Sequence, residues 1–416
     1  MKRCLAFLFV ACGLSFNTAL LYSQVQATAP LSDARVTKPI NESVKALIDS
    51  KKLAGAVTLV AYDGELIHLQ AHGQQSLESK VPMNVDTLFR IHSMTKAIVS
   101  AAALRLREEG KLNLADPVSE YLPEYANSQI HHEQGTAPAK NSIRVMDLFL
   151  HTSGLAYGFT APPELKEAYG KEKLWAGDLT QFSKNAAKLP LMHEPNQGWT
   201  YGIGTDVLGR VIEVCSGKDL DVYLQEMVFD PMGMKDTQFW IRNSQDQKRF
   251  ASVHKLGENG VESGADPLNQ VYLKKPQMIS GGGGLVSTAN DYYQFLRAIA
   301  NDGKHPNGYQ LLKPSSVELM TTNQLPDEIP NIYFGDEQRT HIGFGCGFSV
   351  VKRDTDFGAF KSSPAGEYGW GGAASCHYWV SPKDKNLIVI TLEQTNPYNW
   401  NMEDTLKPVI YRAIRK

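Results

Sequence analysis

The chain has 416 residues, of which 42% are hydrophobic and 21% are charged. That apolar fraction can fill a large core, which excludes disorder as the main state of the chain. A formal net charge of −2, from 42 basic and 44 acidic side chains, offers no electrostatic footprint for nucleic acid or for an anionic membrane. Five cysteines are too few for a disulfide scaffold of this length. These features favour a globular enzyme that acts on a small molecule.

The first 27 residues are typical of a secretory signal peptide. Lys2 and Arg3 precede an apolar run, and Val25 and Ala27 stand at the two positions that signal peptidase reads. We expect cleavage after Ala27 and export to the periplasm or to the medium. The apolar run is interrupted well short of the length of a membrane span, and no other segment is apolar enough to cross a bilayer. Lipidation at Cys12 is an alternative.

Cleavage would leave three cysteines in the mature chain: Cys215, Cys346 and Cys376. An odd count in an oxidising compartment allows at most one internal disulfide. All three lie in apolar surroundings, so we expect buried free thiols, while a disulfide between two of them stays open.

Strand patterns occur at both ends of the mature chain. After an amphipathic helix through 44–48, two β-rich runs at 56–62 and 65–71 are joined by Asp63-Gly64, which is the strongest short signal for a β-hairpin. Three further strands and a closing helix are expected towards the C-terminus, at 344–351, 375–380, 387–392 and 404–414. These strands can share one antiparallel sheet.

The pattern changes in the middle of the chain, where residues 116–270 carry helical periodicity and long polar loops. A clear helix over 206–214 stops at Ser216-Gly217. We therefore expect an α/β fold of the α+β type. Residues 28–115 and 271–416 would form a discontinuous sheet domain with five or more antiparallel strands flanked by helices, and residues 116–270 a mainly helical inserted domain.

Several common catalytic signatures are missing from the sequence. There is no Gly-x-Ser-x-Gly elbow, no Walker A sequence and no His-Glu-x-x-His zinc motif. The glycine run 281–284 is better explained as a tight turn that feeds a helix starting near Thr288, with Asp291 completing a capping box, than as a phosphate loop.

The informative motif is Ser93-Met94-Thr95-Lys96. Two other Ser-x-x-Lys sequences, at 252–255 and 349–352, lie in a polar stretch and in a predicted strand. Ser93, by contrast, opens a helical run through 94–109 that ends at Gly110, and residues three apart share one face of a helix. Lys96 can therefore reach the Ser93 hydroxyl and accept its proton if burial favours the neutral amine. A surface Ser and Lys without a catalytic role is the alternative for this motif alone.

Two further clusters support the catalytic interpretation. Tyr201 lies in the Gly-rich stretch 199–204, just before the helix at 206–214. Gly371 and Gly372 lie at the entrance to a predicted strand, where the backbone must approach another group closely. Each cluster by itself could be a turn with a packed aromatic ring.

Together, these residues resemble the serine β-lactamase and penicillin-binding-protein superfamily, and within it the class C β-lactamases and the family VIII carboxylesterases. The resemblance extends over most of the mature chain and rests on four segments: 89–96, 148–155, 282–288 and 370–372. It implies a β-lactamase-like fold.

Carried over to this chain, the resemblance implies that Ser93 is the acylated nucleophile and Lys96 its proton acceptor. Tyr201 would pass the proton to the leaving group and later activate water. The oxyanion hole would be formed by the backbone N–H groups of Ser93 and Ala373, and losing one such donor typically costs about 100-fold or more in rate.

The chain departs from the lactamase pattern at two positions. Ile203 stands where the second motif has Asn, and Trp370-Gly371-Gly372 stands where the third has Lys-Thr-Gly. A pocket bordered by Ile203 and Trp370 in place of an amide and a cation should favour neutral, apolar acyl groups. Both changes look like the carboxylesterase branch.

The eleven histidines allow a Ser-His-Asp arrangement in principle, and a histidine distant in the sequence stays open as a partner of Ser93. His92 is adjacent to Ser93, but the side chains of neighbours on a helix point about 100° apart. His92 should therefore not accept the proton of Ser93. His151, in the stretch 151–155, is expected to cap or brace the inserted region.

We therefore expect an exported serine hydrolase that cleaves short-chain carboxylic esters, with no metal and no cofactor. Its partner would be a small-molecule ester, amide or lactam, and the oligomeric state stays open. One alternative is an amidase or D-Ala-D-Ala-type peptidase, including weak β-lactamase action. Another is a non-catalytic relative that binds peptidoglycan or a protein through the same cleft. Acyl transfer to an alcohol or amine in place of water also stays open.

Overall fold

The computed structural model describes residues 33–133, 135–264, 271–334, 337–355 and 362–415. The predicted signal peptide and Cys12 lie outside these ranges. Within them, no helix is long and apolar enough to span a membrane.

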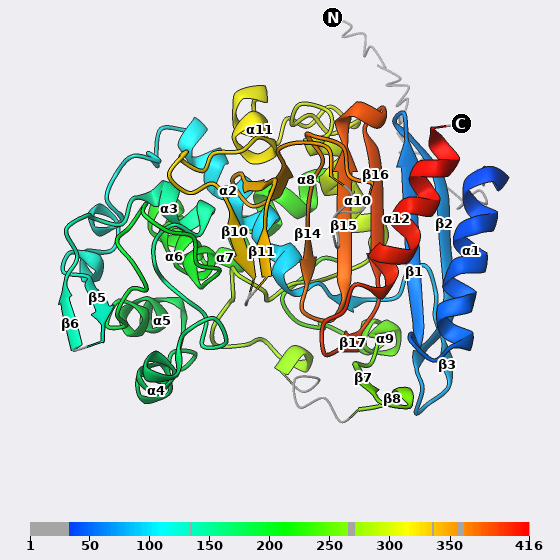
Figure 1. Ribbon diagram of the computed structural model, residues 1–416, viewed down its shortest axis with the longest axis horizontal. Coiled ribbons are helices and arrows are strands. Elements are labelled where there is room, and N and C mark those ends of the chain that lie inside the picture. The colour runs from blue at the N-terminus through cyan, green and yellow to red at the C-terminus, as the bar shows by residue number, and fades with distance from the viewer. Residues whose placement is uncertain (1–32, 134, 265–270, 335–336, 356–361, 416) are drawn as a thin grey trace, which may run out of the picture. The chain divides into compact units, whose positions relative to one another are not determined.

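The framework is an eight-stranded sheet in the order β12-β13-β14-β15-β16-β1-β2-β3, with every neighbouring pair antiparallel (Figure 1). The strands come from both ends of the chain: β1 (Gly55–Tyr62), β2 (Glu65–Ser76), β3 (Val81–Pro82), β12 (Ile342–Phe344), β13 (Ser349–Val351), β14 (Tyr368–Gly372), β15 (Cys376–Ser381) and β16 (Leu387–Leu392). The β1–β2 hairpin turns at Asp63 and Gly64, whose φ angles of 53° and 80° suit a two-residue hairpin turn. The predicted hairpin and the antiparallel sheet are confirmed.

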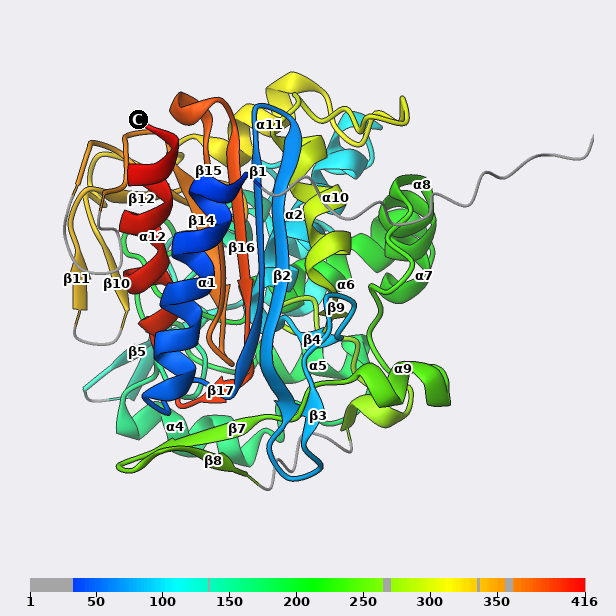
Figure 2. The ribbon, with the colours of Figure 1, turned by 90° about the vertical axis from the view of Figure 1, so that its right-hand side faces the viewer.

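Helices cover both faces of the sheet (Figure 2). On one face, α1 (Ala34–Asp49) and α12 (Asn401–Ile414) pack on β1, β15 and β16 through a separate apolar cluster that includes Val44, Trp379 and Leu406. On the other face, α2 (Thr95–Glu108) and α10 (Ala289–Ile299) belong to the main core. The helix predicted over 94–109 is confirmed, and a short 3-10 turn, His92–Met94, leads into it.

The middle of the chain is mainly helical and contributes no described strand to the large sheet. Its helices are α3 (Val145–Leu150), α4 (Pro163–Lys171), α5 (Leu179–Ala186), α6 (Gly204–Ser216), α7 (Leu220–Leu224), α8 (Asp230–Met232) and α9 (Ser244–Arg249). The predicted end of α6 is confirmed, because Gly217 caps it with a left-handed φ of 70°.

Small sheets and one more helix complete the described fold. A hairpin of β5 (Gln129–His132) and β6 (Gly135–Pro138) lies in the helical region, and β7 (His254–Gly257) and β8 (Gly260–Ser263) pair with β17 (Thr395–Asn396). The remaining elements are β4 (Phe89–Arg90), which pairs with β9 (Val286–Ser287), β10 (Ile332–Phe334), which pairs with β11 (Glu337–Arg339), and α11 (Pro314–Thr321).

Two sequence-based expectations need correction. The run 344–351 is not one strand: β12 and β13 form a hairpin whose turn contains Gly347, with a φ of 95°. The capping box at α10 is only half formed. The side chain of Thr288 accepts the N–H of Asp291, but the Asp291 carboxylate turns away and accepts the N–H of Asp236 at 2.7 Å.

Cys215, Cys346 and Cys376 are free thiols, as expected. Cys346 and Cys376 are buried, whereas Cys215 is half-buried. Burial raises the pKa of Cys215 to about 11 and the pKa of Cys346 and Cys376 to about 12, so none of them is a reactive thiolate at neutral pH.

Candidate active site

Ser93, Lys96 and Tyr201 meet at one point. Ser93 lies in the 3-10 turn before α2, and Lys96 follows it in the first turn of α2 with 1% of its surface exposed. Tyr201, 108 positions later in the chain than Ser93, lies outside any helix or strand, just before α6. The fold thus brings the three residues expected to be catalytic within hydrogen-bond reach.

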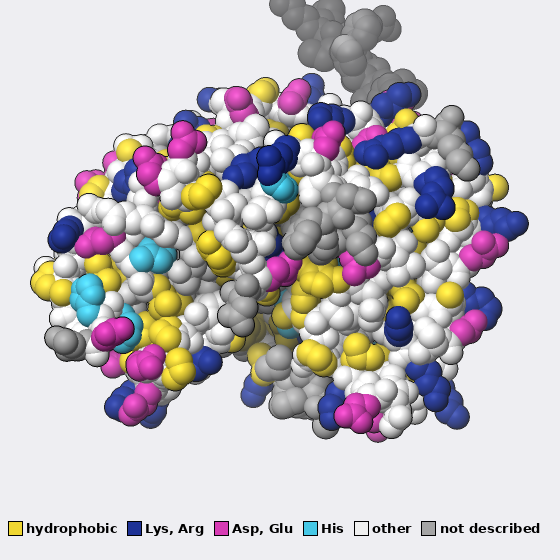
Figure 3. Space-filling model, in the orientation of Figure 1, with side chains coloured by type: hydrophobic (Ala, Val, Ile, Leu, Met, Phe, Trp, Pro, Cys, Tyr) yellow, Lys and Arg dark blue, Asp and Glu magenta, His cyan; other side chains and the backbone are white. Residues whose placement is uncertain are grey.

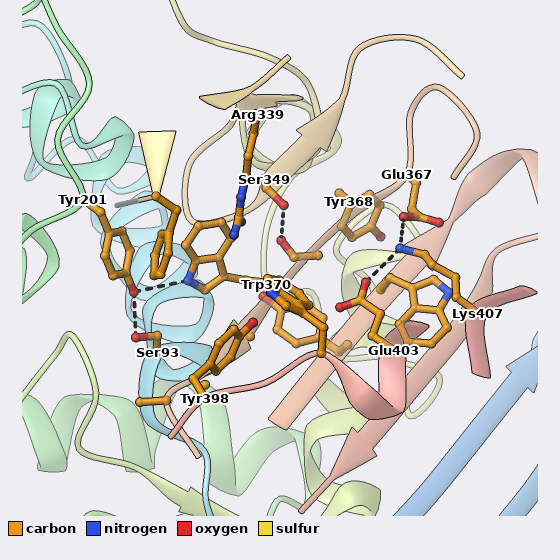
Figure 4. A pocket seen from close by; sticks show the side chains of 18 of the residues that line it. Ser93, Tyr201, Arg339, Ser349, Glu367, Tyr368, Trp370, Tyr398, Glu403 and Lys407 are labelled. Carbon is orange, nitrogen blue, oxygen red and sulfur yellow. Dashed lines mark hydrogen bonds and ion pairs between the residues drawn. The ribbon is translucent and has the colours of Figure 1, made fainter. Parts of the chain in front are cut away.

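The contacts converge on the Ser93 hydroxyl. The phenol of Tyr201 donates a hydrogen bond to Ser93 Oγ at 2.7 Å, as Figure 4 shows, and Lys96 Nζ donates to the same oxygen at 3.2 Å. Lys96 Nζ also lies 4.9 Å from the centroid of the Tyr201 ring. A serine hydroxyl becomes a strong nucleophile only when a neighbour accepts its proton. Two groups able to take part in that transfer therefore contact this oxygen.

Lys96 has two further partners that the motifs did not indicate. Its Nζ donates to Tyr157 OH at 3.0 Å and to the carbonyl of Gly282 at 2.6 Å. With Ser93 Oγ, Lys96 Nζ therefore has three hydrogen-bond partners. Gly282 belongs to the glycine run that was expected to have only a structural role, so that expectation was incomplete.

A buried carboxylate, Asp206, organises this side of the site. In the first turn of α6, it accepts hydrogen bonds from Ser280 Oγ at 2.6 Å, Gly282 N at 2.9 Å and Tyr157 OH at 3.3 Å. Burial raises the pKa of Asp206, although the charge of Lys96 and these hydrogen bonds oppose the rise. Burial and the neighbouring Asp206 hold the pKa of Tyr157 well above its usual value of 10, so Tyr157 keeps its proton and links Lys96 to Asp206.

Strand β14 forms the opposite wall of the site. Its Trp370 donates from Nε1 to Tyr201 OH at 3.3 Å (Figure 4). A Cβ on Gly372 would lie 2.4 Å from the carbonyl oxygen of Ile91, and one on Gly371 would lie 2.8 Å from the Tyr398 hydroxyl. Gly372 therefore lets the strand approach the segment that carries Ser93, and Gly371 leaves room for the Tyr398 hydroxyl.

The site opens into a cavity of about 520 Å³. Its wall includes Ser93 and Ala373, together with an aromatic set: Phe159, Tyr201, Phe334, Tyr368, Trp370, Tyr378, Trp379, Tyr398 and Trp400. On the visible face of the molecule, acidic and basic side chains are interspersed without a large patch of one sign (Figure 3), in keeping with the near-zero net charge. The cavity suits a small, mostly apolar ligand.

Charged residues line the far end of the cavity. Lys407 Nζ lies 2.7 Å from Glu367 and 2.9 Å from Glu403 (Figure 4). Burial opposes ionisation of Glu403, but the charge of Lys407 and a hydrogen bond from His377 lower its pKa to about 2. The ion pairs keep these charges compensated. In the described ranges, no cluster of His, Cys, Asp and Glu side chains is arranged to hold a metal ion.

The motif resemblance placed Ile203 at the border of the pocket, but in the structure Ile203 does not line the cavity. It immediately precedes α6, has no exposed surface and packs in the main core. It is absent from the residues that line the cavity, whereas Trp370, Gly371 and Gly372 are present. The apolar character of the pocket comes from the aromatic set instead.

His92 and His151 agree with the expectations from the sequence: His92 is not a hydrogen-bond partner of Ser93 among the described contacts, and His151 caps a helix. No hydrogen bond joins the imidazole of His92 to Ser93 in the described part of the chain, and burial, with the charges of Arg90 and Lys96, lowers its pKa to about 4. His151 caps α3 with a left-handed φ of 60°, and its N–H bonds to the carbonyl of Asp147.

Comparisons with known proteins agree with this geometry. The chain is 35% identical over 367 residues to Protein Rv1367c of Mycobacterium tuberculosis (strain ATCC 25618 / H37Rv). The aligned region covers 85% of this chain and 89% of the relative. It is 31% identical over 369 residues to Esterase EstB of Burkholderia gladioli, with 83% and 87% covered. Among solved structures, EstCE1, described as a hydrolase with promiscuous acyltransferase activity, matches with a TM-score of 0.78, 25% identity and coverage of 91% and 99%.

The Beta-lactamase family model matches residues 40–407, which is most of the chain. The expected β-lactamase-like fold is confirmed by this match and by the large antiparallel sheet with flanking helices. The chain belongs to the Beta-lactamase family and is a serine hydrolase with esterase relatives.

Proposed function

We propose that this protein is exported and hydrolyses short-chain carboxylic esters through an acyl-enzyme on Ser93. The observation that carries the proposal is the contact of both Tyr201 OH and Lys96 Nζ with Ser93 Oγ, at 2.7 and 3.2 Å, at the wall of an aromatic cavity. Export rests on the N-terminal sequence alone.

Acylation starts from the form in which Lys96 is a neutral amine: Ser93 Oγ attacks the ester carbonyl, its O–H bond breaks, and Lys96 Nζ takes the proton and can pass it on to Tyr201. The negative charge on the carbonyl oxygen is stabilised by the backbone N–H groups of Ser93 and Ala373. Tyr201 returns the proton to the departing alcohol, which breaks the C–O bond and leaves the acyl group on Ser93. A water molecule then attacks the acyl carbonyl and gives a proton to the same pair. The bond between the acyl carbon and Ser93 Oγ breaks, the pair returns the proton to Ser93 Oγ, and the acid leaves.

The lining of the cavity supports a neutral acyl group. Trp370 stands at the place in the third motif where lactamases have a cation. The aromatic rings of Phe334, Tyr398 and Trp400 also line the cavity. Both basic residues of the described lining are already paired: Lys407 with Glu367 and Glu403, and Arg339 with Glu337 at 3.2 Å. These features favour an ester over a β-lactam or a D-Ala-D-Ala peptide.

Steady-state comparison of three substrates tests the proposal: 4-nitrophenyl acetate, a cephalosporin and a D-amino-acid amide. We expect the ester to have a kcat/KM at least about 100-fold above the other two, because the site lacks the lactamase amide and cation contacts. Ser93→Ala should abolish ester turnover. Equal or higher activity on the cephalosporin or the amide, or full activity of Ser93→Ala, would contradict the proposal.

Acyl transfer is a second candidate, favoured by the description of EstCE1 as a hydrolase with promiscuous acyltransferase activity. The acyl-enzyme would be attacked by an alcohol in place of water. Adding a short alcohol during hydrolysis of 4-nitrophenyl acetate should then raise nitrophenol release and give the transfer ester in the products. If only acetate forms at every alcohol concentration, this second activity is absent.

A further inference from the structure

One buried histidine holds the loop that carries Tyr201. Because Tyr201 lies between α5 and α6, outside any helix or strand, its neighbours must fix the direction of its phenol. Among these neighbours, His151 makes contacts on both sides of the tyrosine. It is 1% exposed and reaches the loop from the C-terminal end of α3.

His151 accepts the backbone N–H groups of the two residues that flank Tyr201. Its backbone carbonyl accepts the N–H of Thr200 at 2.9 Å, and its ring Nδ1 accepts the N–H of Gly202 at 3.4 Å. The imidazole also packs against the phenol, with ring centroids 4.7 Å apart. The histidine thus contacts the residue before Tyr201, the residue after it and the ring of Tyr201.

The backbone around His151 leaves little room for adjustment. A Cβ on Gly202 would lie 1.8 Å from the carbonyl oxygen of Leu155, so the segment after His151 and the Tyr201 loop are packed backbone to backbone. The ring of His151 is itself packed between Trp199, with centroids 5.7 Å apart, and Phe344, with centroids 5.2 Å apart. Moving the imidazole would therefore move the loop.

The imidazole must be neutral to accept the Gly202 N–H, since only an unprotonated ring nitrogen is an acceptor. Burial, with the positive charge of Lys96, holds the pKa of His151 well below its usual 6.5. The proton is then on Nε2, which has no hydrogen-bond partner among the described residues. Within these ranges, a substitution that removes Nε2 therefore breaks no hydrogen bond.

We propose that His151 is the positioning residue for Tyr201: its carbonyl and Nδ1 hold the two flanking residues, and its ring directs the phenol at Ser93. The inference rests on the role proposed above for Tyr201. His151 itself touches no reacting atom; it acts through the tyrosine.

Two substitutions separate the acceptor atom from the shape of the ring. His151→Asn keeps an acceptor near the position of Nδ1, and Asn tolerates the left-handed backbone of this position. His151→Phe keeps an aromatic ring and loses the acceptor. Because a displacement of about 1 Å can cost on the order of 100-fold in rate, we expect His151→Phe to lower kcat for 4-nitrophenyl acetate by about 10- to 100-fold with little change in KM, and His151→Asn to stay within about fivefold of the unmodified enzyme.

The second readout is the rate at which a fluorophosphonate labels Ser93, which needs no ester substrate. It should fall in parallel with kcat in His151→Phe. His254→Asn is the matched control, because His254 is also buried and accepts a backbone N–H, that of Leu77 at 3.2 Å, in another part of the fold. His254→Asn should lower the thermal stability by an amount similar to that in His151→Phe, but it should leave the labelling rate unchanged.

A folded His151→Phe with unchanged kcat and labelling rate would overturn the proposal, and an Asn variant as slow as the Phe variant would overturn the part played by Nδ1. If His151→Phe does not fold, His151→Gln replaces it, since its longer side chain cannot place an acceptor at Nδ1; it should be at least about fivefold slower than His151→Asn, and equal rates would overturn the proposal. If the unmodified enzyme is labelled but does not hydrolyse the ester, the proposed function fails while the labelling rates still test His151.

Discussion

The close backbone approach of β14 to the segment that carries Ser93 makes Gly372→Ala an informative perturbation. A Cβ at this position would lie 2.4 Å from the carbonyl oxygen of Ile91, about 1 Å closer than ordinary van der Waals contact. The obstacle is backbone, not the end of a flexible side chain, and it lies two residues before Ser93. Either β14 or the segment carrying Ser93 must therefore move.

The size of that movement sets the expected effect. A displacement of about 1 Å between the nucleophile and the N–H of Ala373 should lower kcat/KM for 4-nitrophenyl acetate on the order of 100-fold. Overpacking of this kind should also lower the free energy of unfolding by about 1–3 kcal/mol. Steady-state kinetics and urea denaturation, measured on the same preparation, report the two effects separately.

Gly170→Ala is the matched control, because a Cβ on Gly170, in α4, would meet no atom within 4 Å. Removing a glycine from a helix should stabilise the protein by about 0.5–1 kcal/mol and leave kcat/KM unchanged. If Gly372→Ala kept kcat/KM within about threefold and lost no stability, the close packing of β14 on the Ser93 segment would be refuted.

Three further changes test the charges around the site. Tyr157→Phe removes an acceptor of Lys96 at 3.0 Å and should lower kcat about 10-fold with KM nearly constant; an unchanged kcat in the steady-state assay would exclude a supporting role for this phenol. Asp206→Asn leaves the buried Lys96 charge uncompensated and should cost about 3 kcal/mol in urea denaturation, so equal midpoints and slopes would contradict the charge pairing. The pKa of Glu403 is depressed to about 2 despite burial, by Lys407 and a hydrogen bond from His377, so its ionised form stabilises the fold above the unfolded value of 4.5. This stabilisation, about 3 kcal/mol, should be lost as the pH falls from 4.5 to 2, and Glu403→Gln should flatten that part of the stability profile; parallel profiles for the two proteins would refute the assignment.

The framework of the fold was predictable because its signals are local. Asp63-Gly64 fixes a two-residue turn through backbone angles, and Gly217 ends α6 in the same way. The run 344–351 was taken as one strand because its residues are mostly apolar throughout. The run divides at Gly347, which has a φ of 95° and lies where a Cβ would come within 2.8 Å of the Ser100 hydroxyl; this packing against α2 exists only in the folded chain.

The candidate site was predictable only where residue types carry the chemistry. Ser93 and Lys96 share one helix, so their spacing alone indicates contact, whereas Tyr201 was joined to them by the family resemblance. Tyr157 and Asp206 gave no comparable signal: a lone tyrosine in a loop and an acid in the first turn of a helix occur in most proteins.

The error at Ile203 has a related cause. Its position two residues after Tyr201 matches that of the family's Asn, but position in a motif does not fix where an apolar side chain points. With no polar group to satisfy at the cavity, the side chain of Ile203 is buried in the core before α6. Which residues line a pocket is decided by packing between elements, and sequence spacing does not determine that packing.

Covalent labelling tests the central claim most directly. The protein is treated with a fluorophosphonate, its intact mass is measured, and the modified peptide is mapped. The geometry around Ser93 predicts one added label per chain, on Ser93, and no label in Ser93→Ala. Folded protein that stays unlabelled, or a label on another residue that persists in Ser93→Ala, would contradict the assignment of Ser93 as the nucleophile.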